Sequence, residues 1–460
     1  MGLSIGGRRT VRAHPGFKAP VPILLVFFGY CVVEVLLFLN HQSFRDEAQA
    51  WLWAAEFKSW QDYFVVPFEG HPPLWYWILK LLSFGLSFDQ ARWLTVILAV
   101  INGALLLRLL GDRSLLLVAI LLSQFFVVFW GFFFRPYTLM LTLLLCALLA
   151  HRVGRPLLGT WLMALACGLH FLAGLFYALW LVHQLRARVP VRLLIWPSLL
   201  ALVFGAFAVL SAMGNPRGGL DTNGTAFDAL RIFALPFRLS GEPWLIWVGL
   251  MGTLIGIAFW RDKFLLAALL ACLAAFCFFG AFVYGVAEWH FGFIPVLVLV
   301  AFLLGEERLP VWPVVGLMVP QFLNGLLHAS VLLVVPYSSA EQAYAAIAAD
   351  AGDALVSERN LISWPDFVLT APSALHEFRY ISGNTGNVIG PVVYSADRGD
   401  DLWSNPNKLP SAEPSYWIAC RNCERLLESM KRTGFRASVV QEPTAGNNAE
   451  AIGAYRFDRD

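Results

Sequence analysis

Residues 43–80 read SFRDEAQAWLWAAEFKSWQDYFVVPFEGHPPLWYWILK and follow directly on an apolar run at 21–39. This stretch gathers acids, aromatic residues, a His-Pro-Pro element and a lysine in a chain that is otherwise mostly Leu, Phe, Val and Ala. Of the 460 residues, 58% are hydrophobic and only 14% are charged. A water-soluble protein could not bury so much apolar surface, so the sequence predicts a polytopic membrane protein with its polar chemistry beside the first span.

Runs of about 20 apolar residues are long enough to cross a bilayer as helices. The sequence also has shorter runs bounded by charges or by Pro136. The run 156–185 is too long for one span and has His170 near its middle, which favours two short spans that meet there. The expected spans are 21–39, 91–107, 114–134, 136–150, two within 156–185, 192–212, 243–260, 264–286, 289–304 and 311–335.

The segment 73–88 decides the topology. It is short, carries Lys80 in its middle and begins with Trp and Tyr, which is typical of an interfacial helix rather than a span. With eleven spans, Lys and Arg outnumber Asp and Glu in the cytoplasmic segments, as the positive-inside rule requires. This predicts a cytoplasmic basic N-terminus at 1–20, a membrane domain at 21–335 with a first external loop at 40–90, and an extracytoplasmic C-terminus.

The tail at 336–460 has a different composition, because long apolar runs stop and Asp, Ser, Asn, Gly and Pro increase. A helical pattern at 339–350 and short strand-like runs at 353–359, 366–371, 390–396 and 437–442 predict a small soluble α/β domain. Cys420 and Cys423 form a CxxC pair; without a second pair it is more consistent with an incidental pair than with a zinc site. The loop 213–243 is Gly- and Asn-rich, and its length is typical of a mobile lid.

On this topology the polar residues of the membrane domain gather near its outer face. An acid at the mouth of a membrane cavity, such as Asp46 or Glu47, could be a general base, a metal ligand or part of a solvated charge cluster. His71, held extended before two prolines, could face such an acid or be an interfacial histidine without a role. Glu34 lies inside the first span, where it could line the bundle or reach back to the interface.

Three further positions at span ends have similar alternatives. Arg135 begins a span and could bind a phosphate with its planar guanidinium or anchor the helix at the interface. Tyr137 lies beside it. His170 could be a site residue or a core histidine, and His290, within Glu-Trp-His at another helix start, is equally ambiguous.

The motifs RDEAQAWLWA and GHPPLWYWILKLLSFG together closely resemble the first external loop of GT-C glycosyltransferases. The resemblance is to bacterial glycosyltransferase family 39-like proteins, which are relatives of the protein O-mannosyltransferases and the lipid A aminoarabinose transferases. FFFRPYTLMLTLLL resembles their Arg-x-Tyr element, and GLHFLAGLFYALW and EWHFGFIPVLVL are similar to family segments. The resemblance implies a GT-C bundle of about eleven helices with juxtamembrane helices in the first loop.

The resemblance also implies an activity. Members of this family transfer a sugar from a polyprenyl-phosphate carrier to an acceptor at the outer face, usually with inversion. Asp46 matches their general base, with Glu47 beside it. His71 stands where relatives have a lysine at the carrier phosphate, which would leave the charge there dependent on pH. The remaining substrate-binding candidates are Arg45, Glu69, Arg135, Tyr137, His170 and His290.

The expected protein is therefore a membrane hexosyl- or pentosyltransferase of the bacterial inner membrane, with its site and C-terminal domain outside. Its partners would be a lipid-phosphate-linked sugar donor, the bilayer and a glycan, lipid or protein acceptor. No metal or other cofactor is predicted, although relatives differ in metal dependence. A net charge of +2 gives no reason to expect nucleic acid. The alternative is a transporter or flippase for lipid-linked sugars, but neither internal repeats nor a mid-depth polar cluster is evident.

Overall fold

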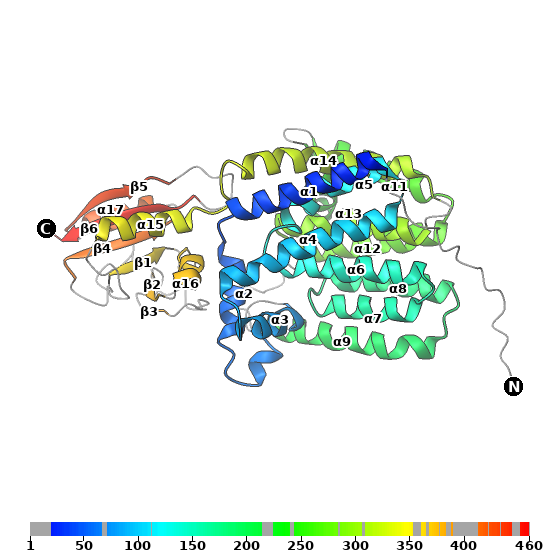
Figure 1. Cartoon of the computed structure of the whole chain (residues 1–460), viewed down its shortest axis with the longest axis horizontal. Helices are drawn as coiled ribbons and strands as arrows, with labels where there is room; N and C mark the ends of the chain where they lie inside the picture. Colours follow the sequence, from blue (N-terminus) through cyan, green and yellow to red (C-terminus); the bar gives the residue numbers. More distant parts are fainter. Residues whose placement is uncertain are drawn as a thin grey trace.

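The computed structural model places a bundle of helices next to a smaller domain built on one β-sheet (Figure 1). The residues it describes are 20–66, 71–111, 113–213, 224–239, 243–283, 286–305, 309–352, 360–364, 368–376, 378–382, 388–389, 413–421, 423–432, 434–443 and 451–459. Six helices among them are long and apolar enough to cross a membrane. These are α1 (Val21–Asn40), α4 (Phe88–Leu110), α9 (Val191–Met213), α12 (Lys263–Phe282), η4 with α13 (Glu288–Gly292 and Phe293–Gly305) and α14 (Val311–Leu332).

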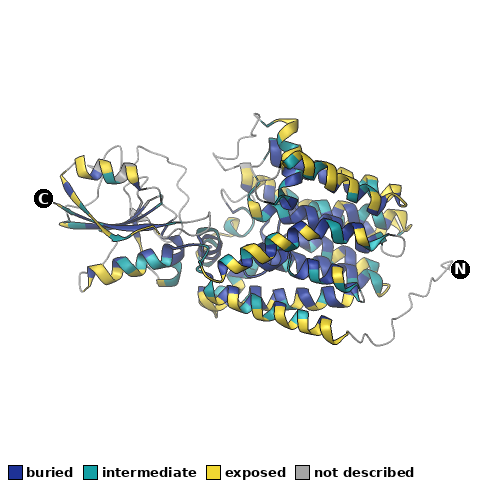
Figure 2. Cartoon of the chain, turned by 90° about the horizontal axis from the view of Figure 1, so that it is seen from above, coloured by how far each residue is buried: buried dark blue, intermediate teal, exposed yellow. Residues whose placement is uncertain are grey.

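Shorter apolar helices complete the bundle. Their bounds are α5 (Ser114–Leu121), α6 (Pro136–Arg152), α7 (Pro156–Cys167), α8 (Ala173–Arg186) and α11 (Trp244–Phe259). The break between α7 and α8 lies at residues 168–172, where the long apolar run was expected to divide. Figure 2 shows that the outward faces of the bundle are exposed although its interior is buried. Exposed Leu, Phe and Trp side chains on those faces are what a lipid environment requires.

The expected span at 114–134 is wrong as a single helix. After α5 the chain turns at Ser123, forms a short π-helix η2 (Phe125–Phe129) and then runs irregularly to Arg135. In a bilayer such a backbone is tolerated only where it is buried in protein. Here the residues from Phe125 to Phe134 are buried throughout. We call residues 130–135 the strap, because they join η2 to α6 across the end of α1.

The loop expected at 40–90 lies at the end of the bundle that faces the sheet domain (Figure 1). It contains α2 (Arg45–Ala55), the short η1 (Gln61–Tyr63) and α3 (Leu74–Ser83). α3 is only ten residues long and packs on α2, as expected for a juxtamembrane helix. The loop after α9 continues into α10 (Ala226–Ala234) and η3 (Leu235–Phe237). Its described part is anchored rather than lid-like, because side-chain amides of α14 bond to the carbonyls of Pro236 and Arg238.

The C-terminal domain has a six-stranded mixed sheet in the order β3-β2-β1-β4-β6-β5, in which β1 is parallel to both β2 and β4. Its strands are β1 (Leu361–Trp364), β2 (Tyr380–Ser382), β3 (Val388–Ile389), β4 (Ser415–Cys420), β5 (Phe435–Gln441) and β6 (Gly453–Arg459), and its helices are α15 (Ala340–Ala351), α16 (Thr370–His376) and α17 (Glu424–Arg432). The helix expected at 339–350 and the strand at 437–442 are present.

The other expectations for this domain are either corrected by the structure or fall on residues that it does not describe. The run 366–371 does not form a strand in its described part but leads into α16, whose early Pro372 suits a first helical turn. The runs 353–359 and 390–396 lie outside the described residues. Cys420 and Cys423 form a disulfide instead of an incidental pair.

Candidate functional site

The site begins at the corner where α1 ends and α2 begins. Glu47 is fully buried there, and its Oε2 lies 2.8 Å from Nε2 of His41 and accepts the backbone N–H of Phe44 at 3.0 Å. Its other oxygen accepts the N–H of Phe134 in the strap. Burial alone would raise the pKa of Glu47, but His41, Arg92 and the Phe134 N–H outweigh it and lower that pKa.

Glu47 is therefore committed to the fold at this corner. The sequence placed it with Asp46 as a catalytic acid, yet adjacent residues on a helix point about 100° apart. The geometry directs Glu47 into the core. Burial lowers the pKa of its partner His41, and the guanidinium of Arg92 donates to the His41 carbonyl at 2.9 Å.

Asp46 faces the other way. Its side chain is 18% exposed, with Nε of Arg45 at 3.1 Å from Oδ1 and Nη2 of Arg135 at 4.0 Å from Oδ2. Nη1 of Arg135 also donates to the backbone carbonyl of Asp46 at 3.0 Å. The carboxylate is thus held between two guanidinium groups and remains open to a reactant.

Arg135 reaches Asp46 because the strap ends in an extended residue. Arg135 is the N-cap of α6, with φ −130° and ψ 162°, and Pro136 fills the first helical position. That arrangement turns the arginine side chain back from the helix toward α2. The side chain is only 7% exposed, so its charge acts in a site largely without water.

His71 is brought to the same place by α3. After His71 and two prolines, the backbone N–H of Leu74 donates to the carbonyl of Gly168 at 3.0 Å, which ties α3 to the break between α7 and α8. The rings of His71 and His170 lie 5.0 Å apart. Burial, followed by the charge of Arg135 and by His290, lowers the pKa of His71 well below 6.5. The pH-dependent charge expected at this position is therefore absent at neutral pH.

His170 and His290 have fixed tautomers. Nδ1 of His170 accepts the backbone N–H of Leu172 at 3.2 Å, and Nδ1 of His290 accepts that of Ala287 at 3.0 Å. A neutral imidazole that accepts at Nδ1 carries its proton on Nε2. The rings are 5.5 Å apart, and Nε2 of His170 is buried without a hydrogen-bond partner in the described part of the chain. Both rings are thus set up as N–H donors.

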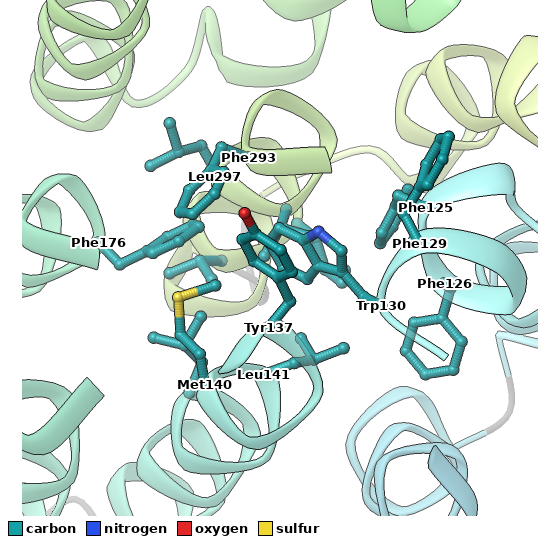
Figure 3. Close-up of a cluster of buried hydrophobic side chains, with 14 of the residues drawn as sticks. Phe125, Phe126, Phe129, Trp130, Tyr137, Met140, Leu141, Phe176, Phe293 and Leu297 are labelled. Atoms are coloured by element: carbon teal, nitrogen blue, oxygen red, sulfur yellow. The ribbon is translucent and has the colours of Figure 1, made fainter. Parts of the chain in front are cut away.

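An aromatic floor lies beneath the histidines. Tyr137 stacks on Trp130 with ring centroids 5.7 Å apart, and its ring is 5.2 Å from that of His170 and 6.1 Å from that of His290. Figure 3 shows Tyr137 between Trp130 and Phe293 in this buried cluster, with Trp130 contributed by the strap and Phe293 by α13. These ring contacts link the strap, α6 and α13 to His170 and His290.

These contacts bring six of the nine residues singled out from the sequence into one group, which we call the polar cluster: Asp46, His71, Arg135, Tyr137, His170 and His290. Arg45 borders it, Glu47 lies behind it, and Glu69 lies outside the described residues. Sequence reasoning missed His41 and Arg92, which hold the α1–α2 corner. Only the His41-x₅-Glu47 spacing across a helix start could have indicated them. No group of three His, Cys, Asp or Glu among the described residues is placed to hold a metal.

An apolar cavity of about 580 Å³ opens between the first loop and α9, lined by Trp60, Gln61, Phe64, Val65 and Phe207. Phe64 also contacts Trp77 of α3, with ring centroids 5.8 Å apart. Trp77 in turn is 6.2 Å from Phe204 of α9. The cavity is thus bordered by α3, the helix that begins three residues after His71.

No family model and no curated protein matches this sequence. Two solved structures are similar in fold. Both are of ArnT from Cupriavidus metallidurans, one bound to undecaprenyl phosphate and one in the apo state. The first has a TM-score of 0.53 at 15% identity and covers 95% of this chain and 98% of that chain. The second has a TM-score of 0.52 at 16% identity and covers 94% and 97%. The chain therefore has the fold of ArnT, a helical bundle followed by a small sheet domain, as the resemblance of its first loop led us to expect.

Proposed function

We propose that this chain transfers a sugar from a polyprenyl-phosphate carrier to an acceptor hydroxyl at the outer face of the membrane, with inversion at the anomeric carbon. The observation that carries the proposal is the polar cluster, which combines an open carboxylate 4.0 Å from Arg135 with two histidines that present N–H groups. The fold supports it, because a similar protein was crystallised with undecaprenyl phosphate.

Asp46 is the general base of the proposed reaction. It takes the proton of the acceptor hydroxyl while that oxygen bonds to the anomeric carbon. The bond from this carbon to the carrier phosphate breaks, and its electron pair remains on the phosphate oxygen. Arg45, 3.1 Å from the carboxylate, keeps it aimed at the acceptor.

The leaving phosphate is received by preorganised donors. Arg135 supplies the positive charge, and the Nε2–H groups of His170 and His290 supply hydrogen bonds that need no protonation of either ring. Such donors stabilise developing negative charge most in a site without water. His71, buried and neutral, completes the wall beside His170. Glu47 is assigned to holding the α1–α2 corner rather than to chemistry.

The apolar cavity beside α3 suits the carrier lipid. Its lining is aromatic and aliphatic except for Gln61, and it lies on the loop that leads to His71. A polyprenyl tail there would place its phosphate toward the polar cluster. Sugar and acceptor remain to be named by experiment, with a glycan, a lipid and a protein as the acceptor classes.

The test is the substitution Asp46→Asn, with Asp62→Asn as the matched control. Asp62 lies in the same loop, is half-buried and accepts the backbone N–H groups of Lys58 and Ser59. A strain lacking the protein is complemented with each variant, and its lipid-linked sugars and envelope glycans are compared by mass spectrometry. Asp46→Asn should lower product formation by roughly 10²–10⁴-fold, the usual contribution of a general base, whereas Asp62→Asn should restore the product.

Product at the wild-type level with Asp46→Asn would remove Asp46 from the mechanism. A membrane transporter of lipid-linked sugars gives a different outcome. It would change the side on which the lipid-linked sugar accumulates without forming a new glycosidic bond in any strain.

A further inference from the structure

Glu34 is a buried acid that the proposed reaction does not use. It lies in α1, six residues before the helix ends, and its side chain is fully buried although most of α1 faces outward. The hydroxyl of Tyr30 lies beside the carboxyl. Tyr30, one turn earlier, directs its hydroxyl to the carbonyl of Ala99 at 3.3 Å. An isolated charge at this depth would be costly, so the group is best accommodated as an un-ionised carboxyl.

The carboxyl occupies a notch in the strap. A Cβ atom built on Gly131 would lie 2.6 Å from each oxygen of Glu34 and 2.9 Å from the carbonyl oxygen of Phe126. A side chain at 131 would therefore meet two obstacles, the Glu34 carboxyl and, at a slightly greater distance, the backbone carbonyl of Phe126.

The strap is held at other points as well. Thr95 donates to the carbonyl of Phe132 at 3.2 Å, and the N–H of Phe134 bonds to Glu47. The next residue is Arg135, whose guanidinium bonds to Asp46. Glu34 from α1 and Glu47 from α2 therefore contact the strap three residues apart, immediately before the arginine that receives the leaving group.

We propose that Glu34 is a positioning residue, an un-ionised acid that locks into the Gly131 notch and holds the strap so that Arg135 faces Asp46. The inference rests on the proposed function for its effect on turnover, but not for the lock itself. A proton-carrying or ion-binding role would require the acid to ionise, whereas the lock requires only its shape and neutral polarity. Glutamine has both.

The lock is tested first without any assay of activity. Thermal unfolding in detergent is measured for Glu34→Gln, Glu34→Ala, Gly131→Ala and the double variant Glu34→Ala/Gly131→Ala. Glu34→Gln should unfold near the wild-type temperature and both alanine variants clearly lower. The double variant should lose less stability than the sum of the two single alanine variants, because the Gly131→Ala methyl group enters space that Glu34→Ala has emptied and meets only the carbonyl of Phe126 there. Additive losses, or Glu34→Gln as unstable as Glu34→Ala, would overturn the lock.

Turnover of the folded fraction then tests positioning. In protein that elutes as a single species, Glu34→Ala should lower kcat for sugar transfer at least tenfold, leave the KM for the acceptor unchanged and be rescued by Glu34→Gln. Full kcat in folded Glu34→Ala, or loss of kcat in Glu34→Gln, would refute the positioning role. If wild-type protein transfers no sugar, the proposed function fails, while the unfolding data still decide the lock.

Discussion

His71 makes the stability of the folded protein depend on pH in a predictable direction. Its pKa in the folded protein is lowered well below 6.5, first by burial and then by Arg135 and His290. In the unfolded chain the ring takes a proton near 6.5, so the unfolded state binds more protons below that pH. The stability that neutral His71 contributes is therefore complete above about pH 6.5 and is lost as the pH falls toward the folded pKa.

We expect the thermal midpoint in detergent to be level from pH 7 to 8 and to fall between pH 6.5 and 5. His71→Asn, which cannot take up a proton, should reduce that fall. The linkage is about 1.4 kcal/mol for each unit of pKa difference. Equal slopes for the wild type and His71→Asn would show that His71 does not carry the depressed pKa.

The sequence indicated which residues belong to the site better than it indicated where their side chains point. The sequence singled out Asp46, Arg135 and His170, because ionisable residues at helix ends in a membrane protein usually have a function. Glu47 was paired with Asp46 because the two are adjacent, and only the fold shows it bonded to His41 and Phe134. The tautomers of His170 and His290 depend on backbone N–H groups that no local pattern displays.

Helix α14 packs very closely against the break between α5 and η2. A Cβ atom on Gly325 would lie 2.0 Å from the carbonyl oxygen of Leu122 and 2.7 Å from the N–H nitrogen of Gln124, so the obstacle is backbone. Gly316 of the same helix offers a matched control, since its Cβ would meet only Leu254 at 3.4 Å.

Gly325→Ala should therefore lower the thermal midpoint in detergent, at a cost of about 1–3 kcal/mol or more, as overpacking usually does. Gly316→Ala should leave the midpoint unchanged or raise it slightly, because alanine favours helix by roughly 1 kcal/mol over glycine. A Gly325→Ala variant as stable as Gly316→Ala would show that α14 is not packed against this break.

Most helices could be predicted from the length of the apolar runs and from the prolines and charges at their ends. Examples are α6, which begins at Pro136, and α3, which follows two prolines. The irregular stretch at 122–135 could not be predicted in this way. A run of Phe and Val is equally apolar whether it continues as a helix or not. The irregular form is stable only because Thr95, Glu47 and α14, which are distant in sequence, satisfy or cover its backbone.

The membrane bundle and the sheet domain are in contact beside the candidate site. α16 of the sheet domain packs on α2, and its Ala371 belongs to the core of the bundle. Tyr337, at the junction, packs on Phe44 and Phe133 with ring centroids 5.2 and 4.9 Å apart. The sheet domain is thus fixed to the helix that carries Asp46. Both must therefore lie on the same side of the membrane, whichever side that is.

The side follows from a chemical argument that can be checked. The disulfide between Cys420 and Cys423 is typical of an oxidising compartment, and the positive-inside rule likewise predicts that this domain lies outside. We predict that a membrane-impermeant maleimide added to spheroplasts labels Arg432→Cys, at a highly exposed position in α17, and not Arg261→Cys, between α11 and α12 at the opposite end of the bundle.

Wild-type protein provides the blank for its five free cysteines, and both variants should be labelled after lysis. The reverse pattern in intact spheroplasts would put Asp46 on the cytoplasmic side. A carrier-linked sugar presented at the outer face could not then reach the polar cluster. Labelling at Arg432→Cys alone would show that Asp46 also lies outside, because α16 of the sheet domain packs on α2. The acceptor would then be a molecule of the cell envelope.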